Sequence, residues 1–155
     1  MAHRPRSQTR ADIADVLNCA CFNTRKASRA LTQLYDNVLR PSGLRITQFT
    51  LLHVLRGYGP MSINSLAEAT VTDRTTLTRN LAILEQRRLV RIRPGSDARV
   101  RVVELTEAGD EAAVAAYPLW QKAQRLDAKR MGEGRLGRLL ADLSLATGAA
   151  TEGRR

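Results

Sequence analysis

The residues best suited to chemistry in this chain are arginines, and they are concentrated in one segment. Between Asp73 and Arg101 the chain carries eight arginines and three acidic residues, a local charge of +5 that is half of the net charge of +10. A guanidinium group stays charged and can donate paired hydrogen bonds to phosphate oxygens or to the acceptors of guanine. The concentration therefore predicts a polyanionic partner, and double-stranded DNA is the first to consider.

Two cysteines form a second group with possible chemistry. We expect Cys19 and Cys21 on one long helix, where about 100° per residue sets them about 200° apart, so that they cannot point the same way. Residue type alone favours small buried groups at a helix interface, and a reducing cytosol argues against a structural disulfide. Oxidation of a thiol and binding of a soft metal or metalloid by the pair stay open as alternatives.

Other classes of chemistry have little support in the sequence. His3 and His53 cannot build a separate zinc site of the usual spacing, and we expect no metal ion and no cofactor. Walker loops, Gly-x-Gly-x-x-Gly loops and Gly-x-Ser-x-Gly elbows are absent, and no histidine stands near Cys21, so we expect no enzyme. No apolar run reaches the roughly 18 residues of a membrane span, which predicts a cytoplasmic protein without a membrane partner.

The elements that position these residues begin with two helices. After a mobile basic arm over residues 1–9, apolar side chains recur three and four positions apart from about residue 11 to residue 40. A second helix, mostly apolar, is expected from Thr47 as its N-cap to the glycines at 57 and 59. Its nearly continuous stripe predicts that it is well buried.

The arginine-rich segment opens with a helix-turn-helix pattern. Ser62 can cap a short helix, and Asp73 can cap a longer one over residues 74–87 after a tight turn. On the longer helix three leucines fall on one side: Leu77, Leu81 and Leu84. The opposite side carries small, hydroxylated and positively charged residues, which suits a helix that enters the major groove of DNA.

A β-hairpin and two further helices complete the expected fold. Residues 89–93 and 100–105 are rich in β-branched side chains and flank a turn-rich loop, the pattern of a wing. Thr106 caps an alanine-rich helix that runs toward Met131, and Pro118 is expected to kink or break it near Tyr117. A last amphipathic helix is expected over about residues 133–147. The chain is thus a single domain over residues 1–155.

The helix and the wing divide the expected DNA contacts. Five residues near the start of the 74–87 helix are candidates for base edges and adjacent phosphates: Arg74, Thr75, Thr76, Thr78 and Arg79. Of these, Arg79 is the strongest candidate for a guanine edge. Three wing residues are candidates for a minor groove or its phosphates: Arg93, Ser96 and Arg99. Asp97 and Arg101 are assigned to the structure of the wing, since an acid at a basic tip more readily closes a turn than contacts DNA.

Helix and wing together resemble the MarR family of bacterial transcriptional regulators. The family's wing signature, Asp-x-Arg followed by five residues and Leu-Thr, is matched by Asp97, Arg99, Leu105 and Thr106. The segment from Thr72 to Arg79 also looks like the family's, and the resemblance covers roughly residues 13–145.

This resemblance implies a mainly α fold with a small β-hairpin wing, built as a homodimer. The winged helix-turn-helix lobe would be residues 42–105, and residues 10–40 and 106–148 would form the dimerisation helices. The family implies a repressor on a palindromic operator that a small ligand or thiol oxidation releases. The residues agree, because the flanking helices carry apolar stripes that the lobe alone could not cover, and a dimer presents two half-sites.

A finer resemblance concerns one cysteine. The pair Cys21-Phe22 stands 14 residues before Tyr35, which is similar to the organic-hydroperoxide-sensing branch of the family. The resemblance makes Cys21 the candidate peroxide-reactive thiol, and Arg25, one turn later, could stabilise a thiolate there. The family also implies a pocket for a small effector, such as an aromatic compound. We assign its lining to four residues: Phe22, Ile46, Phe49 and His53.

Two of these residues depart from the peroxide-sensing branch. Ile46 and Phe49 stand where that branch has tyrosines, and neither can donate a hydrogen bond to a thiolate. Two rival classes also share parts of the pattern. A non-specific architectural DNA-binding or RNA-binding protein would have the same basic helix and hairpin but no discrete footprint. A thiol-dependent enzyme could use Cys21, although the sequence offers it no histidine base.

Overall fold

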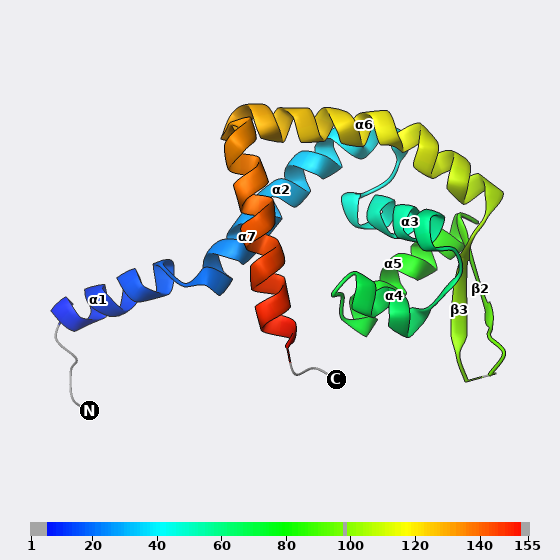
Figure 1. The fold of residues 1–155 in the computed structure, drawn as a ribbon, viewed down its shortest axis with the longest axis horizontal. Coiled ribbons are helices and arrows are strands. Elements are labelled where there is room, and N and C mark those ends of the chain that lie inside the picture. The colour runs from blue at the N-terminus through cyan, green and yellow to red at the C-terminus, as the bar shows by residue number, and fades with distance from the viewer. Residues whose placement is uncertain (1–5, 98, 153–155) are drawn as a thin grey trace.

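The computed structural model describes residues 6–97 and 99–152 and is mainly helical, with one small antiparallel sheet (Figure 1). The elements in chain order are α1 (Arg6–Leu17), α2 (Ala20–Leu39), a 3-10 turn (Arg40–Ser42), α3 (Ile46–Tyr58), β1 (Met61–Ser62), α4 (Ile63–Ala69), α5 (Arg74–Gln86), β2 (Val90–Pro94), β3 (Arg101–Leu105), α6 (Glu107–Met131) and α7 (Glu133–Thr151). The strands pair in the order β1-β3-β2. This architecture confirms the predicted fold class.

The helix predicted over residues 11–40 is two helices, and that prediction was wrong at residues 18 and 19. Cys19 has an extended backbone and precedes α2 as its N-cap. The side chain of Asn23 donates hydrogen bonds to the carbonyl oxygens of Leu17 (2.6 Å) and Cys19 (3.0 Å), which satisfies groups that a helix end leaves open. Part of the basic arm expected over residues 1–9 lies outside the described residues, and residues 6–9 belong to α1.

Helix α3 begins at Ile46, so the expected cap at Thr47 was also wrong. Its first turn is held by a side chain from another helix: the Asp36 carboxylate of α2 accepts hydrogen bonds from the backbone N–H of Ile46 (2.8 Å) and from Arg45 Nη1 (3.1 Å). Gln48 Oε1 accepts the backbone N–H of Arg45 (3.1 Å). The end of α2 is therefore tied directly to the start of α3.

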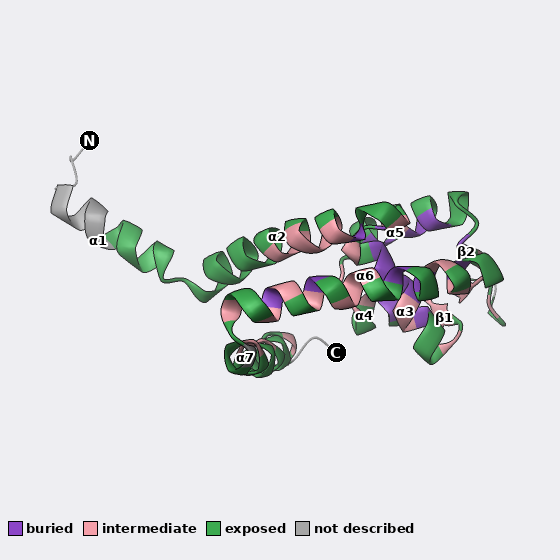
Figure 2. Ribbon diagram, turned by 90° about the horizontal axis from the view of Figure 1, so that it is seen from above, coloured by how far each residue is buried: buried purple, intermediate pink, exposed green. Residues whose placement is uncertain are grey.

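The lobe formed by α3, α4, α5 and the sheet holds the largest core. Its fully buried side chains come from every one of these helices and from β3: Leu52, Leu55, Leu66, Leu77, Leu81, Leu84 and Val103. Figure 2 shows this burial concentrated in the lobe, whereas the visible parts of α1, α2 and α7 are largely exposed. The two predicted strands are paired as a hairpin, with Val90 opposite Leu105 and Ile92 opposite Val103 on the core side.

The sequence predicted a kink or a break near Tyr117, and α6 continues through Pro118, so of these two alternatives the break was wrong. Proline lacks the N–H that would bond to the carbonyl of Val114, and both residues are exposed, which lets water take that carbonyl. Figure 1 shows α6 curving from the wing end toward α7, a bend that agrees with the kink expected from the sequence. Along this path α6 contacts α3, α2 and α7.

The start of α6 packs against the start of β2 at one glycine. Thr106 caps α6 by accepting the Gly109 N–H at its hydroxyl (3.0 Å), and the same hydroxyl lies within donating distance of the carbonyl oxygens of Arg88 and Leu89. A Cβ added at Gly109 would overlap the Leu89 carbonyl oxygen. Backbone approaches backbone here, and a side chain of any size must push the two elements apart.

We expect Gly109→Ala to destabilise the protein by about 1–3 kcal/mol, because the added methyl group displaces backbone in a packed site. Thermal unfolding followed by circular dichroism measures the change. Gly137→Ala is the matched control: a Cβ at Gly137 in α7 meets no atom within 4 Å, so alanine should stabilise by about 0.5–1 kcal/mol through its helix propensity. Equal unfolding temperatures for Gly109→Ala and the wild type would contradict the close approach.

The cap of α5 supplies a pH-dependent test. Asp73 Oδ1 accepts the backbone N–H of Thr76 (2.9 Å), and hydrogen bonds from the side chain and backbone of Thr76 hold the pKa of Asp73 below its ordinary value of 3.8. A lowered pKa in the folded state means that the stabilisation is present above the unfolded pKa and is lost as pH falls through the folded pKa.

Asp73→Ala should therefore lower the unfolding temperature by a constant amount above about pH 5, and the difference from wild type should shrink below about pH 4. Asp73→Asn keeps a cap acceptor but cannot titrate, so at pH 7 it should unfold close to wild type. A difference for Asp73→Ala that stays the same from pH 7 to pH 3 would mean that the carboxylate is not the stabilising cap.

Candidate nucleic-acid interface

Helix α5 has a buried side and an exposed side with mostly small side chains, here called its bare side. Leu77, Leu81 and Leu84 are fully buried in the core. The opposite side carries Thr75, Arg79 and Ala82, and together with Thr78 beside them and Arg74 at the start of the helix these exposed residues line one shallow hollow. The side chains of Thr75, Thr78 and Ala82 are small, and the two arginines add positive charge. This surface of α5 is therefore narrow and basic enough to enter a groove of DNA.

The polar groups on this side differ in how free they are. The Thr78 hydroxyl donates to the Arg74 carbonyl oxygen (2.7 Å), so it can offer only an acceptor to a ligand. Thr76, next to this side, provides the N–H that Asp73 caps. Within the described residues Arg74, Thr75 and Arg79 have no side-chain hydrogen bond or ion pair. The donors of these three side chains therefore remain available.

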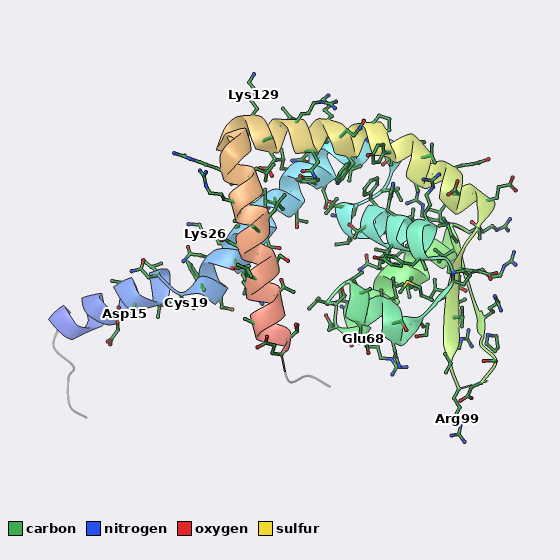
Figure 3. All side chains as sticks on the ribbon, viewed as in Figure 1. Asp15, Cys19, Lys26, Glu68, Arg99 and Lys129 are labelled. Atoms are coloured by element: carbon green, nitrogen blue, oxygen red, sulfur yellow. The ribbon has the colours of Figure 1, made fainter. Side chains whose placement is uncertain are left out.

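Hydrogen bonds within the hairpin shape the tip of the wing. The Gly95 N–H donates to Val100 O (2.7 Å), the Val100 N–H donates to Asp97 O (2.9 Å), and Asp97 Oδ1 accepts the Arg99 N–H (2.9 Å). Asp97 thus closes the turn that carries Arg99. Figure 3 shows Arg99 at the far tip of the hairpin with its side chain directed away from the lobe. Ser96 is exposed in the same loop, and Arg101 is exposed at the first position of β3.

Three other arginines of the segment already have partners. Arg93 Nε lies 2.7 Å from Glu104 Oε2, and Arg91 Nη1 lies 3.4 Å from Glu104 Oε1. Arg87 Nη1 donates to the Gly43 carbonyl oxygen (2.8 Å) and ties the end of α5 to the loop before α3. Arg93 therefore sits on the face of the hairpin rather than at its tip, unlike its fellow wing candidates Ser96 and Arg99.

The structure separates the candidate effector residues into two groups. Cys21, Phe22 and Arg25 lie near the start of α2 and are exposed, and Cys19 is exposed at the junction with α1 (Figure 3). Ile46, Phe49 and His53 lie on α3, whose first residue contacts Asp36 near the other end of α2. At about 1.5 Å per helical residue, the part of α2 between Phe22 and Asp36 is about 20 Å long, and this length separates Phe22 from the start of α3. One chain therefore does not assemble the predicted pocket.

The cysteine geometry expected from the sequence was also wrong. Because Cys19 precedes α2 with an extended backbone, the angle of about 200° that a shared helix would set between Cys19 and Cys21 does not apply. Both thiols are free and exposed, so the expectation of small buried groups is not met within one chain.

His53 belongs to a cluster of stacked rings that joins α3 to α6. Its ring centroid lies 4.1 Å from that of Phe49 and 5.9 Å from that of Tyr117, and Trp120 stacks on both Phe49 (5.9 Å) and Tyr117 (5.4 Å). His53 Nδ1 lies 3.2 Å from the Phe49 carbonyl oxygen. Ring packing of this kind holds the lobe against the helix that leads to α7.

Sequence reasoning missed a cavity of about 670 Å³ between α2, α6 and α7. Its apolar wall includes Leu31 and leucines of α7, and Ile46 lines one end. Asp127 is buried in this wall and, among the described residues, has no hydrogen bond or ion pair. Tyr35 donates to Gln124 Oε1 (2.5 Å), and burial, with the charge of Asp127, raises the pKa of Tyr35. The available signal was Asp127 itself, an acid that follows Trp120 and Ala123 at helical spacing on an otherwise apolar side of α6.

The described residues offer neither a metal site nor a membrane span. Across residues 6–97 and 99–152, no three His, Cys, Asp or Glu side chains gather as metal ligands would. In the same part of the chain, every helix is too short or too polar to cross a membrane.

Known proteins resemble this chain in both sequence and structure. A model of the MarR family matches residues 42–100. The HTH-type transcriptional repressor NicR of Pseudomonas putida is 33% identical over 122 residues, which cover 78% of this chain and 75% of NicR.

Solved structures give the same result. The transcriptional regulator MosR of M. tuberculosis, in complex with DNA, superposes with a TM-score of 0.74 at 42% identity and covers 85% of this chain and 98% of that one. A mutant MarR from E. coli complexed with operator DNA has a TM-score of 0.71 at 22% identity, over 79% of this chain and 89% of that one, and shows the shared fold. The similarity to NicR and MosR over most of each chain, on a winged helix-turn-helix fold, places this protein in the MarR family of DNA-binding transcriptional regulators, which are not enzymes.

Proposed function

We propose that this protein is a sequence-specific repressor that binds a palindromic operator as a homodimer. The observation that carries the proposal is the bare side of α5, where Arg74, Thr75 and Arg79 keep their donors free beside a wing that extends Arg99. The start of α5 would enter the major groove, and the wing tip would reach the flanking minor groove. The similarity to a repressor and to a DNA-bound regulator supports this assignment.

Base reading falls to the residues with free donors. Arg79 stands in the second turn of α5 with small neighbours, so its guanidinium can reach a guanine edge in the plane of the base. Arg74 and the free hydroxyl of Thr75 would donate to adjacent phosphates or bases, the Thr78 hydroxyl could accept from a base amino group, and Thr76 would contact DNA if its side chain turned from Asp73. Arg99 and Ser96 at the wing tip would follow the shape and potential of the minor groove, which depend less on base identity.

The dimer would be built from helices outside the lobe. In α1, Ile13, Val16 and Leu17 are each more than half exposed, and in α7 Leu140 and Leu145 are 56% and 74% exposed. These side chains, and the cavity between α2, α6 and α7, form apolar surface that the chain itself leaves uncovered. A second copy packing against residues 10–40 and 106–148 would cover it and set two 42–105 lobes one helical turn apart on DNA.

Release from DNA would follow oxidation of Cys21 by an organic hydroperoxide, whose O–O bond breaks as the sulfur takes one oxygen, giving a sulfenic acid on Cys21 and an alcohol. Both thiols are exposed near the junction between α1 and α2, next to the surface that the dimer would use. A polar oxygen added to Cys21 there would disturb apolar packing between subunits. A small aromatic effector, the alternative, needs Phe22 to meet Ile46, Phe49 and His53, which a partner subunit's α2 could accomplish.

The rival class is a non-specific DNA-binding or RNA-binding protein. It would share the salt dependence that phosphate neutralisation imposes, but it would protect no discrete sequence. Footprinting on the DNA upstream of the protein's own coding region separates the two classes, because a repressor of this type should protect one short, symmetric segment and a non-specific binder should protect none.

Arg79→Ala should weaken binding to the footprinted segment about 10- to 100-fold, because one bidentate base contact is lost, and weaken binding to random DNA far less. Fluorescence anisotropy on 30-bp duplexes, a length of about three helical turns, measures both. Arg99→Ala should weaken binding to both duplexes about equally. It should also reduce the magnitude of the slope of log affinity against log salt by about 1. Arg125→Ala on α6 removes the same charge from an exposed residue outside the candidate nucleic-acid interface and is the control. Equal losses on both duplexes for Arg79→Ala would refute base reading by Arg79.

Cumene hydroperoxide should release the wild-type protein from the footprinted segment, and Cys21→Ser should stay bound because it has no thiol to oxidise. Cys19→Ser is the matched control and should still be released. A reductant should restore binding of the wild type. If Cys21→Ser is released as readily as wild type, oxidation of this thiol is not the signal. Release of both proteins by a small aromatic acid would instead favour a ligand pocket.

A further inference from the structure

Glu104 differs from the other acids near the proposed interface in what it binds. Asp73, Glu85 and Asp97 each accept a backbone N–H, from Thr76, Ile92 and Arg99 respectively. These three carboxylates shape a helix start, a strand and a turn. Glu104 instead pairs with two arginine side chains and, in the described structure, accepts no backbone N–H. Its contacts concern charge and not backbone geometry.

The register of the wing explains why both arginines reach the same carboxylate. Arg91 is directly opposite Glu104 across β2 and β3, and Arg93 is its diagonal neighbour on the same face. The other face of the hairpin packs Ile92 and Val103 into the core, so these three charged side chains must share the outer face. Glu104 lies in the central strand of the sheet, between the two edge strands.

Both carboxylate oxygens are occupied. Oε2 lies 2.7 Å from Arg93 Nε and Oε1 lies 3.4 Å from Arg91 Nη1. The Glu104 side chain is 20% exposed, whereas those of Arg91 and Arg93 are 70% and 52% exposed. Arg91 and Arg93 thus cover Glu104 while they remain accessible to solvent. The carboxylate partly neutralises the charge of each guanidinium group.

The pairing of Glu104 with Arg91 and Arg93 should weaken phosphate contacts more than base contacts. An arginine that leaves Glu104 for a phosphate breaks an ion pair and leaves a carboxylate facing a polyanion, which lowers its net gain. Phosphate contacts are independent of sequence, whereas base edges carry the sequence information. The residues lining the bare side of α5 include no acid, so base reading is not reduced in the same way.

We propose that Glu104 is a specificity-determining residue that restrains Arg91 and Arg93 on the outer face of the wing and so limits the binding of sequence-unrelated DNA. The inference rests on the proposed function for its meaning in regulation. The restraint itself can be measured on random DNA alone. Glu104 touches neither base nor phosphate in this assignment and acts through the two arginines.

The test is Glu104→Gln, which keeps the shape of the side chain and one acceptor while removing the charge. Anisotropy titrations with a random 30-bp duplex (about three helical turns) and with the footprinted segment, over a range of salt concentrations, give affinity and salt slope. We expect binding to random DNA to tighten about three- to tenfold, as one or two ion pairs cease to compete. The salt slope should steepen by about 1 for each additional phosphate that an arginine neutralises. Binding to the footprinted segment should tighten less, so that the ratio between the two affinities falls.

Two further variants show whether the arginines mediate the effect. Glu111→Gln removes the same charge from an exposed residue of α6 that has no ion pair in the described structure, and it should leave the salt slope unchanged. Arg91→Ala and Arg93→Ala, added together to Glu104→Gln, should return random binding to or below the wild-type value. Unfolding temperatures of all variants, measured alongside, show that the wing is intact.

The outcomes separate this inference from the proposed function. Weaker binding of random DNA by folded Glu104→Gln would overturn the inference, because it would mean that Glu104 aims the arginines at phosphate. An effect equal to that of Glu111→Gln would also overturn it, since net charge alone would then explain the change. A discrete footprint with either result leaves the proposed function standing. Tighter random binding with no footprint for the wild type would support the restraint and contradict the repressor.

Discussion

The complete burial of one side of α5 is the constraint on which the rest of this molecule depends. Leu77, Leu81 and Leu84 are fully buried, and removing a buried leucine costs about 2–5 kcal/mol. With that side fixed, the helical period turns Arg79 outward, and Arg74 is exposed because it is the first residue of the helix. The direction of the charge is therefore set by apolar packing, and the electrostatic function needs no additional interaction to orient the helix.

The lobe is attached to the flanking helices by a few contacts of different kinds. Asp36 of α2 holds the first turn of α3, and rings of α3 and α6 stack around Trp120. In the proposed dimer, a change at the subunit interface could alter the spacing of the two lobes through these two contacts, because each is local and is made by elements outside the recognition helix.

Sequence reasoning succeeded where a feature depends on residues close in the chain. The caps at Ser62, Asp73 and Thr106 and the hairpin pairing follow from local rules, and the structure has them all. It failed where the deciding partner is distant or unusual. The helix break before α2 needs Asn23 to reach back, and the start of α3 needs a carboxylate from α2. The continuation of α6 past Pro118 depends on solvent reaching one carbonyl, which a residue-type rule cannot see.

Distant partners also decide which charges of the candidate nucleic-acid interface are free. The sequence locates eight arginines in one segment but cannot tell which of them are engaged. In the described structure Arg87, Arg91 and Arg93 have partners, whereas the side chains of Arg74, Arg79, Arg88, Arg99 and Arg101 have none. Free cations stand on the recognition helix, at Arg88 just after it, at the wing tip and at the start of β3, whereas the engaged Arg91 and Arg93 lie along β2. In the proposed complex, unpaired arginines would therefore stand at the start of the recognition helix and at the wing tip, where the grooves would be read, which a uniformly basic surface of the same net charge would not achieve.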